Sequence, residues 1–194
     1  MSFKVKVVAV TGAAGGIGHA VCRYFAGEGA AIAAIDKKDT VISFADELKR
    51  DGVKTAHAVA DIGDATSVAK AFAHLVAELG PVDILINNAG YSDHPTLART
   101  DPRGWQADMN GNLNGAYNCA HAVLPGMQAK RQGSIIAVGS VNGLSALGDP
   151  AYSAAKAGMI SLTRSLALEY GRYGIRSNIV LPATVRTPLW DARA

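Results

Sequence analysis

Cysteine and long apolar runs are both scarce in this chain of 194 residues. The two cysteines, Cys22 and Cys119, lie far apart, so the sequence offers neither a disulfide framework nor the ligand spacing of a zinc site. The first apolar run, which ends at Val10, is too short for a signal sequence or a membrane span. We therefore expect a cytoplasmic protein with no bound metal and no membrane partner.

A large excess of charge of one sign is absent as well. The chain has 19 Lys and Arg residues against 16 Asp and Glu residues, and the basic ones are scattered along the sequence. This pattern excludes an extended nucleic-acid-binding surface. Hydrophobic residues make up 49% of the chain, which excludes a disordered protein. Without a linker or an internal repeat, one domain over residues 1–194 is expected.

Short apolar runs alternate with longer amphipathic stretches along the whole chain. The runs that we expect to form strands are Val5–Val10, Ala31–Ile35, Thr55–Val59, Ile84–Ile86, Ser134–Val138 and Ser177–Leu181. The stretches that we expect to form helices are Ile17–Glu28, Thr40–Arg50, Ala65–Leu79, Pro102–Lys130 and Ala151–Tyr173. Uninterrupted apolar strands separated by helices predict a parallel sheet covered on both faces. With right-handed crossovers, the expected fold class is α/β, a three-layer, doubly wound sheet of the Rossmann type.

A glycine-rich turn follows the first expected strand. Residues 11–18 read Thr-Gly-Ala-Ala-Gly-Gly-Ile-Gly and lead directly into the first expected helix. Such a turn brings backbone N–H groups, at the positive end of the helix dipole, close to a pyrophosphate. Glycines alone often mark only a turn, but here Asp36 ends the second strand near the offset of about 20 residues expected for a ribose-binding acid. The combination predicts a dinucleotide site.

Asp36 also indicates which dinucleotide binds. A carboxylate at this position accepts hydrogen bonds from both hydroxyls of the adenosine ribose and repels a 2′-phosphate, so NAD is favoured over NADP. Lys37 and Lys38 follow directly and could serve a phosphate, but they do not remove the carboxylate. We interpret these two lysines as solvated charges of a loop.

Tyr152 and Lys156 stand four residues apart on an expected helix, so both side chains lie on one face. A free tyrosine has a pKa near ~10, and a neighbouring ammonium group lowers that value by favouring the phenolate. By itself such a pair is most often a surface feature. However, Ser140 follows the fifth expected strand, residues 87–90 (Asn-Asn-Ala-Gly) follow the fourth, and Asn112 lies on the helix between them. Because the carboxyl ends of parallel strands share one edge, we expect these groups to converge on one site.

In the order and spacing of these motifs, the chain resembles the short-chain dehydrogenase/reductase family over essentially its whole length. The matching pieces are Thr11-Gly12-x-x-x-Gly16-x-Gly18, Asp36, Asp61, Asn87-Asn88-Ala89-Gly90, Asn112, Ser140, Tyr152-x-x-x-Lys156 and Pro182 with Thr187. The series is far more specific than any one motif. The resemblance implies a nicotinamide-dependent oxidoreductase with the fold described above, and Asp36 makes NAD the expected cofactor.

The resemblance implies a role for each of four catalytic positions. Tyr152 would be the general acid/base, and Lys156 would bind the nicotinamide ribose and lower the pKa of the tyrosine. Ser140 would hydrogen-bond the substrate oxygen and the negative charge that develops on it. Asn112 would hold a water that connects Lys156 to solvent.

The resemblance also implies the cofactor contacts. The residues expected to bind NAD are Gly12, Gly16, Ile17, Gly18, Asp36, Asp61, Ile62, Asn88, Ala89, Gly90, Tyr152, Lys156, Pro182, Val185 and Thr187. In the family, the position of Asp61 contacts the adenine, and the positions of Val185 and Thr187 hold the nicotinamide carboxamide.

Two of these assignments have alternatives in the sequence itself. Asp61 precedes the helix expected at Ala65–Leu79 and could instead be its N-terminal cap. Asn112 has two neighbours of the same type, Asn110 and Asn114, which we expect to be helix-surface or packing residues.

The chain departs from the family pattern in three places. Ala183 stands where the family usually has glycine after Pro182, and the segment between Ser140 and Tyr152 is about one residue short. Beyond Ala194 the family normally continues through a substrate-covering segment, a helix and a seventh strand, which would cover the exposed edge of the sixth strand. We therefore expect a longer natural protein, and an intact mass of 20.0 kDa would contradict that expectation.

The function expected from these observations is oxidation of a secondary alcohol by NAD, or the reverse reduction of a ketone. The residues expected to line the substrate pocket are Tyr91, His94, Asn142, Leu144 and Trp190. Two alternatives are a keto-reductase of carrier- or coenzyme-bound acyl chains, which usually draws on NADPH, and a nucleotide-binding module without catalysis. The resemblance further implies a homotetramer acting on a small-molecule substrate.

Overall fold

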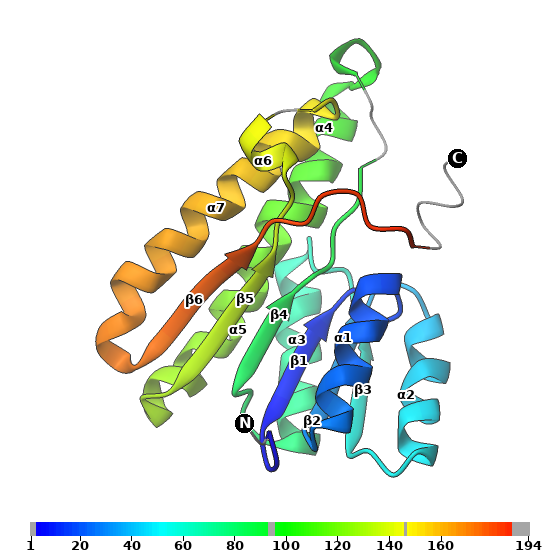
Figure 1. The fold of residues 1–194 in the computed structure, drawn as a ribbon, viewed down its shortest axis with the longest axis vertical. Coiled ribbons are helices and arrows are strands. Elements are labelled where there is room, and N and C mark those ends of the chain that lie inside the picture. The colour runs from blue at the N-terminus through cyan, green and yellow to red at the C-terminus, as the bar shows by residue number, and fades with distance from the viewer. Residues whose placement is uncertain (1–2, 93–95, 146, 188–194) are drawn as a thin grey trace.

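Six parallel strands form one sheet in the order β3-β2-β1-β4-β5-β6 in the computed structural model, which describes residues 3–92, 96–145 and 147–187 (Figure 1). The strands are β1 (Val7–Thr11), β2 (Ala31–Asp36), β3 (Thr55–Val59), β4 (Ile84–Asn87), β5 (Gly133–Val138) and β6 (Ile175–Val180). The longer helices are α1 (Gly16–Gly27), α2 (Thr40–Arg50), α3 (Ala65–Leu79), α4 (Pro102–Met109), α5 (Gly115–Lys130) and α7 (Pro150–Tyr170). The predicted doubly wound α/β fold is thus confirmed.

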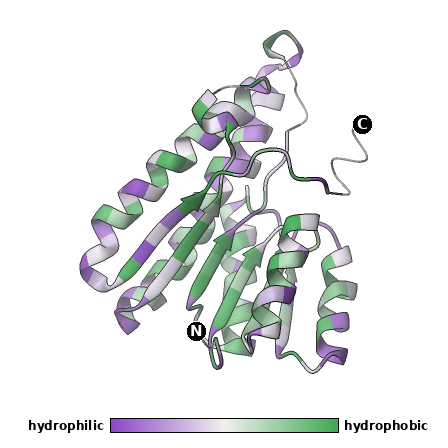
Figure 2. Cartoon of the chain, viewed as in Figure 1, coloured by the Kyte–Doolittle hydropathy of each residue, from purple (hydrophilic) through white to green (hydrophobic). Residues whose placement is uncertain are grey.

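Successive residues of the strands point into two separate apolar layers. In β1, Val7 and Ala9 pack with residues of α3 and α5, whereas Val8 and Val10 pack with residues of α1 and α2. The whole of β1 is buried, as expected for a parallel strand with helices on both faces. Figure 2 shows the result, with hydrophobic strands in the middle layer and hydrophilic residues on the outer helices and loops.

The first strand begins later than its sequence predicts, so the expected start at Val5 is wrong. Val5 has a left-handed backbone (φ 62°) and is 96% exposed, whereas Val7 begins the strand and is buried. The sixth strand begins earlier than expected, at Ile175, whose side chain is 2% exposed. Apolar residues at the ends of a run do not reveal by themselves which of them the sheet covers.

Helix ends and single helical turns also differ from the expectation. The last helix ends at Tyr170, and Gly171–Tyr173 continue it as a 3₁₀ turn. A short helix, α6 (Asn142–Ser145), and a 3₁₀ turn at Leu97–Arg99 were not predicted. One turn of helix is too short to produce a recognisable apolar period.

The helix predicted over Pro102–Lys130 is interrupted near its middle. Residues Asn110–Asn114 form a π-helical turn between α4 and α5. Within it, the side-chain Nδ2 of Asn112 donates a hydrogen bond to the carbonyl oxygen of Asp108. π-Helical turns are frequent at functional sites, where they change the direction of one side chain.

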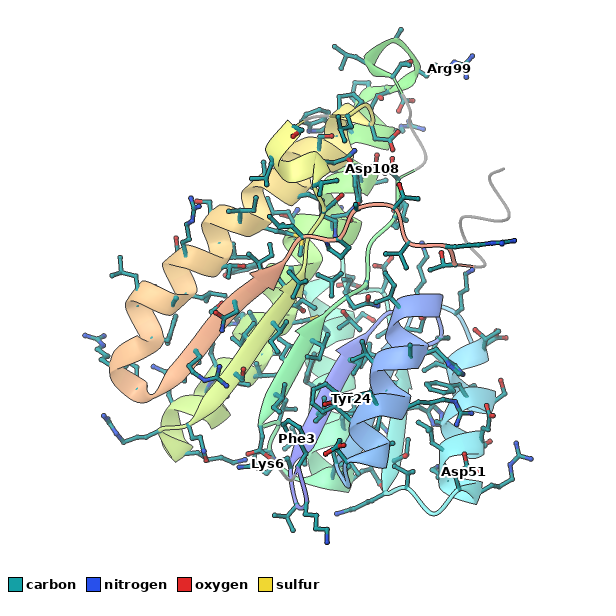
Figure 3. All side chains as sticks on the ribbon, in the orientation of Figure 1. Phe3, Lys6, Tyr24, Asp51, Arg99 and Asp108 are labelled. Atoms are coloured by element: carbon teal, nitrogen blue, oxygen red, sulfur yellow. The ribbon has the colours of Figure 1, made fainter. Side chains whose placement is uncertain are left out.

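The strand order reverses at β1, which has β2 on one side and β4 on the other. In doubly wound sheets this reversal opens a crevice at the carboxyl ends of the strands. At the opposite end of the sheet, Asp83 connects β1 to α5. It accepts a hydrogen bond from the Val7 N–H (2.9 Å) and forms ion pairs with Lys130 (3.0 Å) and Lys6 (3.6 Å). Figure 3 shows Lys6 at this end, far from the labelled Asp108.

Both cysteines are buried free thiols, one in each apolar layer. Burial raises the pKa of Cys22 and of Cys119 to about 12. Across the described residues, no helix is long and apolar enough to span a membrane. The same residues contain no cluster of three or more His, Cys, Asp or Glu side chains arranged to hold a metal ion.

Candidate active site

The turn between β1 and α1 depends on glycine at two positions. Gly12 has a φ of +65°, and a Cβ atom there would lie 2.9 Å from the Cα atom of Ala89. Gly18 packs underneath, where a Cβ atom would lie 2.0 Å from the carbonyl oxygen of Gly12. Gly12 lines the crevice, whereas Gly18 supports the turn from below rather than lining a cavity.

The side chain of Asn88 fastens this turn to the end of β4. Its Nδ2 donates hydrogen bonds to the carbonyl oxygens of Thr11 (3.0 Å) and Gly12 (3.2 Å). In return, the hydroxyl of Thr11 accepts hydrogen bonds from the backbone N–H groups of Asn88 and Ala89, both at 3.0 Å. These four bonds hold the two loops together as one wall of the crevice.

The beginning of α1 borders a cavity of about 240 Å³. The lining residues are Gly12, Gly15, Gly16, Ile17, Asp36, Lys37, Lys38, Ala60, Asp61, Ile62, Asn88, Ala89, Gly90, Tyr91, Gly111 and Thr187. Within the described ranges, no side chain caps the helix start at Gly15, so first-turn N–H groups are available to a ligand. A glycine turn, an uncapped helix start and a cavity beside them fit the diphosphate of a dinucleotide.

Asp36 lies in this first cavity at the end of β2. Its Oδ2 accepts a hydrogen bond from the N–H of Ala14 (3.1 Å), and its Oδ1 accepts one from the N–H of Lys38 (3.0 Å). These two bonds hold the Asp36 carboxylate in a fixed orientation between two loops.

Lys37 is more than a solvated charge, because its ammonium lies 4.2 Å from the centre of the Tyr91 ring, which lines the same cavity.

Asp61 also lines the first cavity, next to Ile62. Its Oδ1 accepts a hydrogen bond from the N–H of Gly63 (2.8 Å). The N-terminal cap of α3 is instead Asp64, whose Oδ1 accepts from the N–H of Thr66 (2.8 Å). The alternative interpretation of Asp61 as the cap is therefore wrong.

A second cavity of about 510 Å³ adjoins the first. The residues that line both cavities are Ile17, Asn88, Gly90, Tyr91 and Thr187. The remaining lining residues of the second cavity are Ser92, Val138, Gly139, Ser140, Val141, Asn142, Leu147, Asp149, Tyr152, Lys156, Pro182, Ala183, Thr184 and Val185. They come from the ends of β4, β5 and β6 and from the beginning of α7. The site thus joins a cavity for a dinucleotide to one for a small molecule.

Lys156 is nearly fully buried, with 2% of its surface exposed. Its Nζ donates a hydrogen bond to the carbonyl oxygen of Val138 (3.0 Å) and lies 5.3 Å from the centre of the Tyr152 ring. Burial lowers the pKa of the ammonium group to about 8, because a charge is costly away from water. A negative charge on the Tyr152 oxygen would stabilise the charged form of this lysine.

Asn112 is fully buried in the π-helical turn. Its Nδ2 donates hydrogen bonds to the carbonyl oxygens of Tyr91 and Asp108, both at 2.8 Å, while its Oδ1 has no partner among the described residues. A Cβ atom at Gly90 would lie 2.5 Å from this oxygen and 3.0 Å from the Lys156 Nζ. Glycine at this position leaves the amide oxygen and the ammonium group facing one small space, which fits a bridging water.

Ser140 follows β5 and lines the second cavity. Its Oγ accepts a hydrogen bond from the backbone N–H of Asn142 (3.2 Å), which fixes the position of the oxygen. A hydroxyl group that accepts one hydrogen bond can still donate its own proton. Ser140 is therefore able to donate to an oxygen of a ligand in the cavity.

The segment after β6 reaches both cavities. Pro182 and Val185 line the second cavity, and Thr187 lines both. Ala183, which replaces the family's glycine, lines the second cavity as well. The three cofactor positions expected here therefore lie beside the crevice.

The candidates for the substrate pocket divide into three groups. Tyr91 and Asn142 line the second cavity, whereas Leu144 is 67% exposed and does not line it. His94 and Trp190 lie outside the described residues. Leu144 was a wrong candidate because α6 turns its side chain toward solvent.

The two asparagines beside Asn112 serve the helix rather than the cavities. The Nδ2 of Asn114 donates to the Oδ1 of Asn110 (2.7 Å), and the Nε2 of Gln106 donates to the same oxygen (2.8 Å). This network stabilises the π-helical turn, in line with the packing role expected for both.

Sequence reasoning missed three polar residues of the second cavity, Ser92, Asp149 and Thr184. Asp149 precedes α7 by one residue and Tyr152 by three, and that spacing was the available signal. Ser92 lies in the loop after β4, where no periodic pattern indicates which way a side chain points.

The fold and the site define a class of protein: a Rossmann-type oxidoreductase with a Tyr–Lys pair in the cavity next to its dinucleotide crevice. Comparison with known proteins gives the family. The model of the short chain dehydrogenase family matches residues 6–194. An uncharacterised oxidoreductase of Schizosaccharomyces pombe is 40% identical over the whole chain, which covers 72% of that protein. The chain belongs to the short-chain dehydrogenase/reductase family, whose members are nicotinamide-dependent oxidoreductases.

Solved structures agree with this assignment. An oxidoreductase of the same family from Burkholderia thailandensis is 47% identical, with a TM-score of 0.88, and the match covers 97% of this chain and 72% of that one. A xylitol dehydrogenase solved with NAD⁺ bound is 29% identical, with a TM-score of 0.93, and the match covers 100% of this chain and 76% of that one.

Proposed function

We propose that this protein is an NAD-dependent oxidoreductase that interconverts a secondary alcohol and the corresponding ketone. One observation carries the proposal: the cavity lined by Asp36 shares five lining residues with the cavity lined by Ser140, Tyr152 and Lys156. Bound NAD would accept the hydride of the alcohol or, as NADH, return it to the ketone. The residues of the chain supply the remaining steps.

Each of four residues has a distinct part in that chemistry. Tyr152 takes the proton of the alcohol, or gives one to the ketone oxygen, as general base or acid. Lys156, held by the Val138 carbonyl, stabilises the phenolate. Ser140 donates a hydrogen bond to the reacting oxygen. Asn112, whose Oδ1 has no partner among the described residues, holds the water through which protons pass between Lys156 and solvent.

The cofactor assignment depends on Asp36. The carboxylate is oriented by the N–H groups of Ala14 and Lys38. It would accept hydrogen bonds from the adenosine ribose hydroxyls of NAD and would repel a 2′-phosphate. The glycine turn and the uncapped start of α1 receive the diphosphate. The similar xylitol dehydrogenase holds NAD⁺, which supports the same assignment here.

The two alternatives receive less support. A keto-reductase that draws on NADPH would have Asp36 against the extra phosphate of its cofactor. A binding module without catalysis would have no need of Ser140, Tyr152 and Lys156 in one cavity. The proposal also includes a cytoplasmic setting, based on the two free cysteines, and a homotetramer, based on the family alone.

The replacement Asp36→Ala tests the proposed cofactor. Wild-type protein is expected to turn over with NAD and to use NADP at least about 100-fold less efficiently. In the variant, kcat/KM with NAD should fall and kcat/KM with NADP should rise, because the charge that repels the phosphate is gone. Both kcat/KM values are measured by the absorbance of the reduced cofactor. A structural change in the turn that weakens binding of both cofactors equally does not alter the ratio of kcat/KM with NAD to kcat/KM with NADP.

A matched control is Asp39→Ala, an exposed acid on the same loop whose side chain makes no cap bond to α2. It should leave the NAD-to-NADP ratio unchanged. A wild type that prefers NADP, or an Asp36→Ala variant whose ratio equals that of the wild type, would contradict the NAD assignment.

A further inference from the structure

The charges of the second cavity bear on the class of substrate. Among the described residues that line it, the charged ones are Asp149 and Lys156. Lys156 already donates to the Val138 carbonyl and lies beside the Tyr152 ring. Asp149, by contrast, has no side-chain hydrogen bond or ion pair within the described ranges. Its carboxylate is available to a ligand.

Asp149 is held in place by the beginning of the helix that carries Tyr152. Its backbone is left-handed (φ 47°, ψ 69°), a conformation that aspartate tolerates better than most residues. The N–H of Ser153 donates to the Asp149 carbonyl (2.8 Å), and the Ser153 hydroxyl donates to the Gly148 carbonyl (2.7 Å). The backbone of Asp149 is thus fixed relative to Tyr152, which keeps the carboxylate within reach of the same cavity.

Ser92 is a second polar group of the same cavity without a partner. It is 6% exposed, and its hydroxyl makes no hydrogen bond to any described residue. Buried polar groups are nearly always paired, and leaving one unpaired is costly. A ligand hydroxyl near this loop would supply the missing partner.

We infer that the substrate is a neutral secondary alcohol with at least one further hydroxyl group, such as a vicinal diol or a longer polyol. The inference rests on the proposed function and adds the substrate class to it. The Asp149 carboxylate accepts a hydrogen bond from the second hydroxyl while the first faces Tyr152 and Ser140. A substrate carboxylate or phosphate is repelled by Asp149, and no second cation lines the described part of the cavity to offset this. A cationic substrate meets two positive charges, those of Lys156 and of the bound nicotinamide ring, against the one negative charge of Asp149.

Four-carbon alcohols that differ in one group provide the test. The probes are 2-butanol, 2,3-butanediol, 3-amino-2-butanol and 3-hydroxybutanoate, assayed by NAD reduction. The wild type is expected to show the highest kcat/KM with 2,3-butanediol, at least about tenfold above 2-butanol, as a hydrogen bond to a charged group provides. Binding of 2,3-butanediol, observed by ligand-detected NMR without turnover, should be stronger than binding of 2-butanol.

The variant Asp149→Asn removes the charge and keeps a residue that tolerates a left-handed backbone. The diol-to-2-butanol ratio of kcat/KM should fall about tenfold, the NMR preference for the diol should disappear, and the relative rate with 3-hydroxybutanoate should rise. Ser92→Ala should lower the diol ratio by a smaller factor. Asp46→Asn, an exposed acid of α2 far from the cavities, should change none of these values.

The outcomes separate the inference from the proposed function. Turnover of 2-butanol without a diol preference, or a diol preference that Asp149→Asn leaves intact, would overturn the inference and leave the proposed function standing. A wild type that prefers 3-hydroxybutanoate or the amino alcohol would do the same. Absence of NAD reduction with all four probes, by protein that still binds NAD, would count against the proposed function and this inference together.

Discussion

Tyr152→Phe is expected to lower kcat for alcohol oxidation by about 10²- to 10⁴-fold, because the variant has no hydroxyl to exchange the substrate proton. The ring that packs near Lys156 is retained, so the free energy of unfolding should change by less than about 1 kcal/mol. NAD affinity, measured by calorimetry, should fall at most severalfold. Steady-state NAD reduction and urea unfolding of the same preparation provide the two readouts.

Tyr117→Phe is the matched control, since Tyr117 is 53% exposed on α5, away from both cavities. It should retain wild-type activity. If Tyr152→Phe kept wild-type kcat, Tyr152 could not be the acid/base group. If it lost activity and unfolded much more readily, the loss would report on structure instead.

Lys156→Met is expected to lower kcat by about 10²-fold or more without lowering stability at neutral pH. The activity falls because the positive charge near the Tyr152 ring, which stabilises the phenolate, is lost. Burial lowers the pKa of this lysine from 10.5 to about 8, which corresponds to a cost of about 3 kcal/mol for keeping it charged. Methionine avoids this cost. It leaves the Val138 carbonyl without its hydrogen-bond donor, however, and this loss of about 1–3 kcal/mol offsets most of the gain in stability. The free energy of unfolding should therefore be equal or slightly higher.

The effect on stability depends on pH in a defined direction. Between pH 8 and 10.5 the unfolded wild type keeps a proton on Lys156 that the folded protein releases, so this group makes wild-type stability rise with pH. The stability of Lys156→Met relative to the wild type should be highest below pH 8 and should decline through this window. Urea unfolding at several pH values measures the difference.

Lys70→Met, which changes an exposed lysine of α3, serves as the control and should alter neither activity nor the pH dependence. A Lys156→Met variant that is several kcal/mol less stable at pH 7 would show that the lysine has a structural role. Wild-type activity in that variant would remove Lys156 from the chemistry.

The sheet and most of its helices could be predicted because their signals are local. Apolar strands buried on both faces, such as β1, stand out as uninterrupted runs, and helices of three or more turns show a clear period. The π-helical turn at Asn110–Asn114 could not be predicted in the same way, because it depends on what Asn112 contacts outside its own helix. The exposed Val5 shows the complementary limit, since an apolar residue does not reveal whether anything covers it.

The same distinction between local and long-range signals applies to the residues of the candidate site. Asp36, Ser140 and Tyr152 were placed at the crevice because each stands at a strand end or on a helix at a recognisable spacing, and the structure brings all three to the adjoining cavities. The hydrogen bonds of Asn88 join segments that are far apart in sequence. The availability of the Asp149 carboxylate depends on the conformation of one loop. Neither leaves a pattern in the sequence.

The central claim is that a hydride passes from an alcohol in the second cavity to NAD in the first. Transfer of deuterium from the alcohol to NAD tests this claim most directly. The protein is incubated with NAD and 2,3-butanediol that carries deuterium on both carbinol carbons, and the NADH formed is analysed by mass spectrometry. The account predicts NADH that is one mass unit heavier, with one deuterium per molecule, because the carbinol hydrogen passes directly to the nicotinamide. NADH without the label would contradict it, as would the absence of NADH from both this diol and 2-butanol with protein that binds NAD.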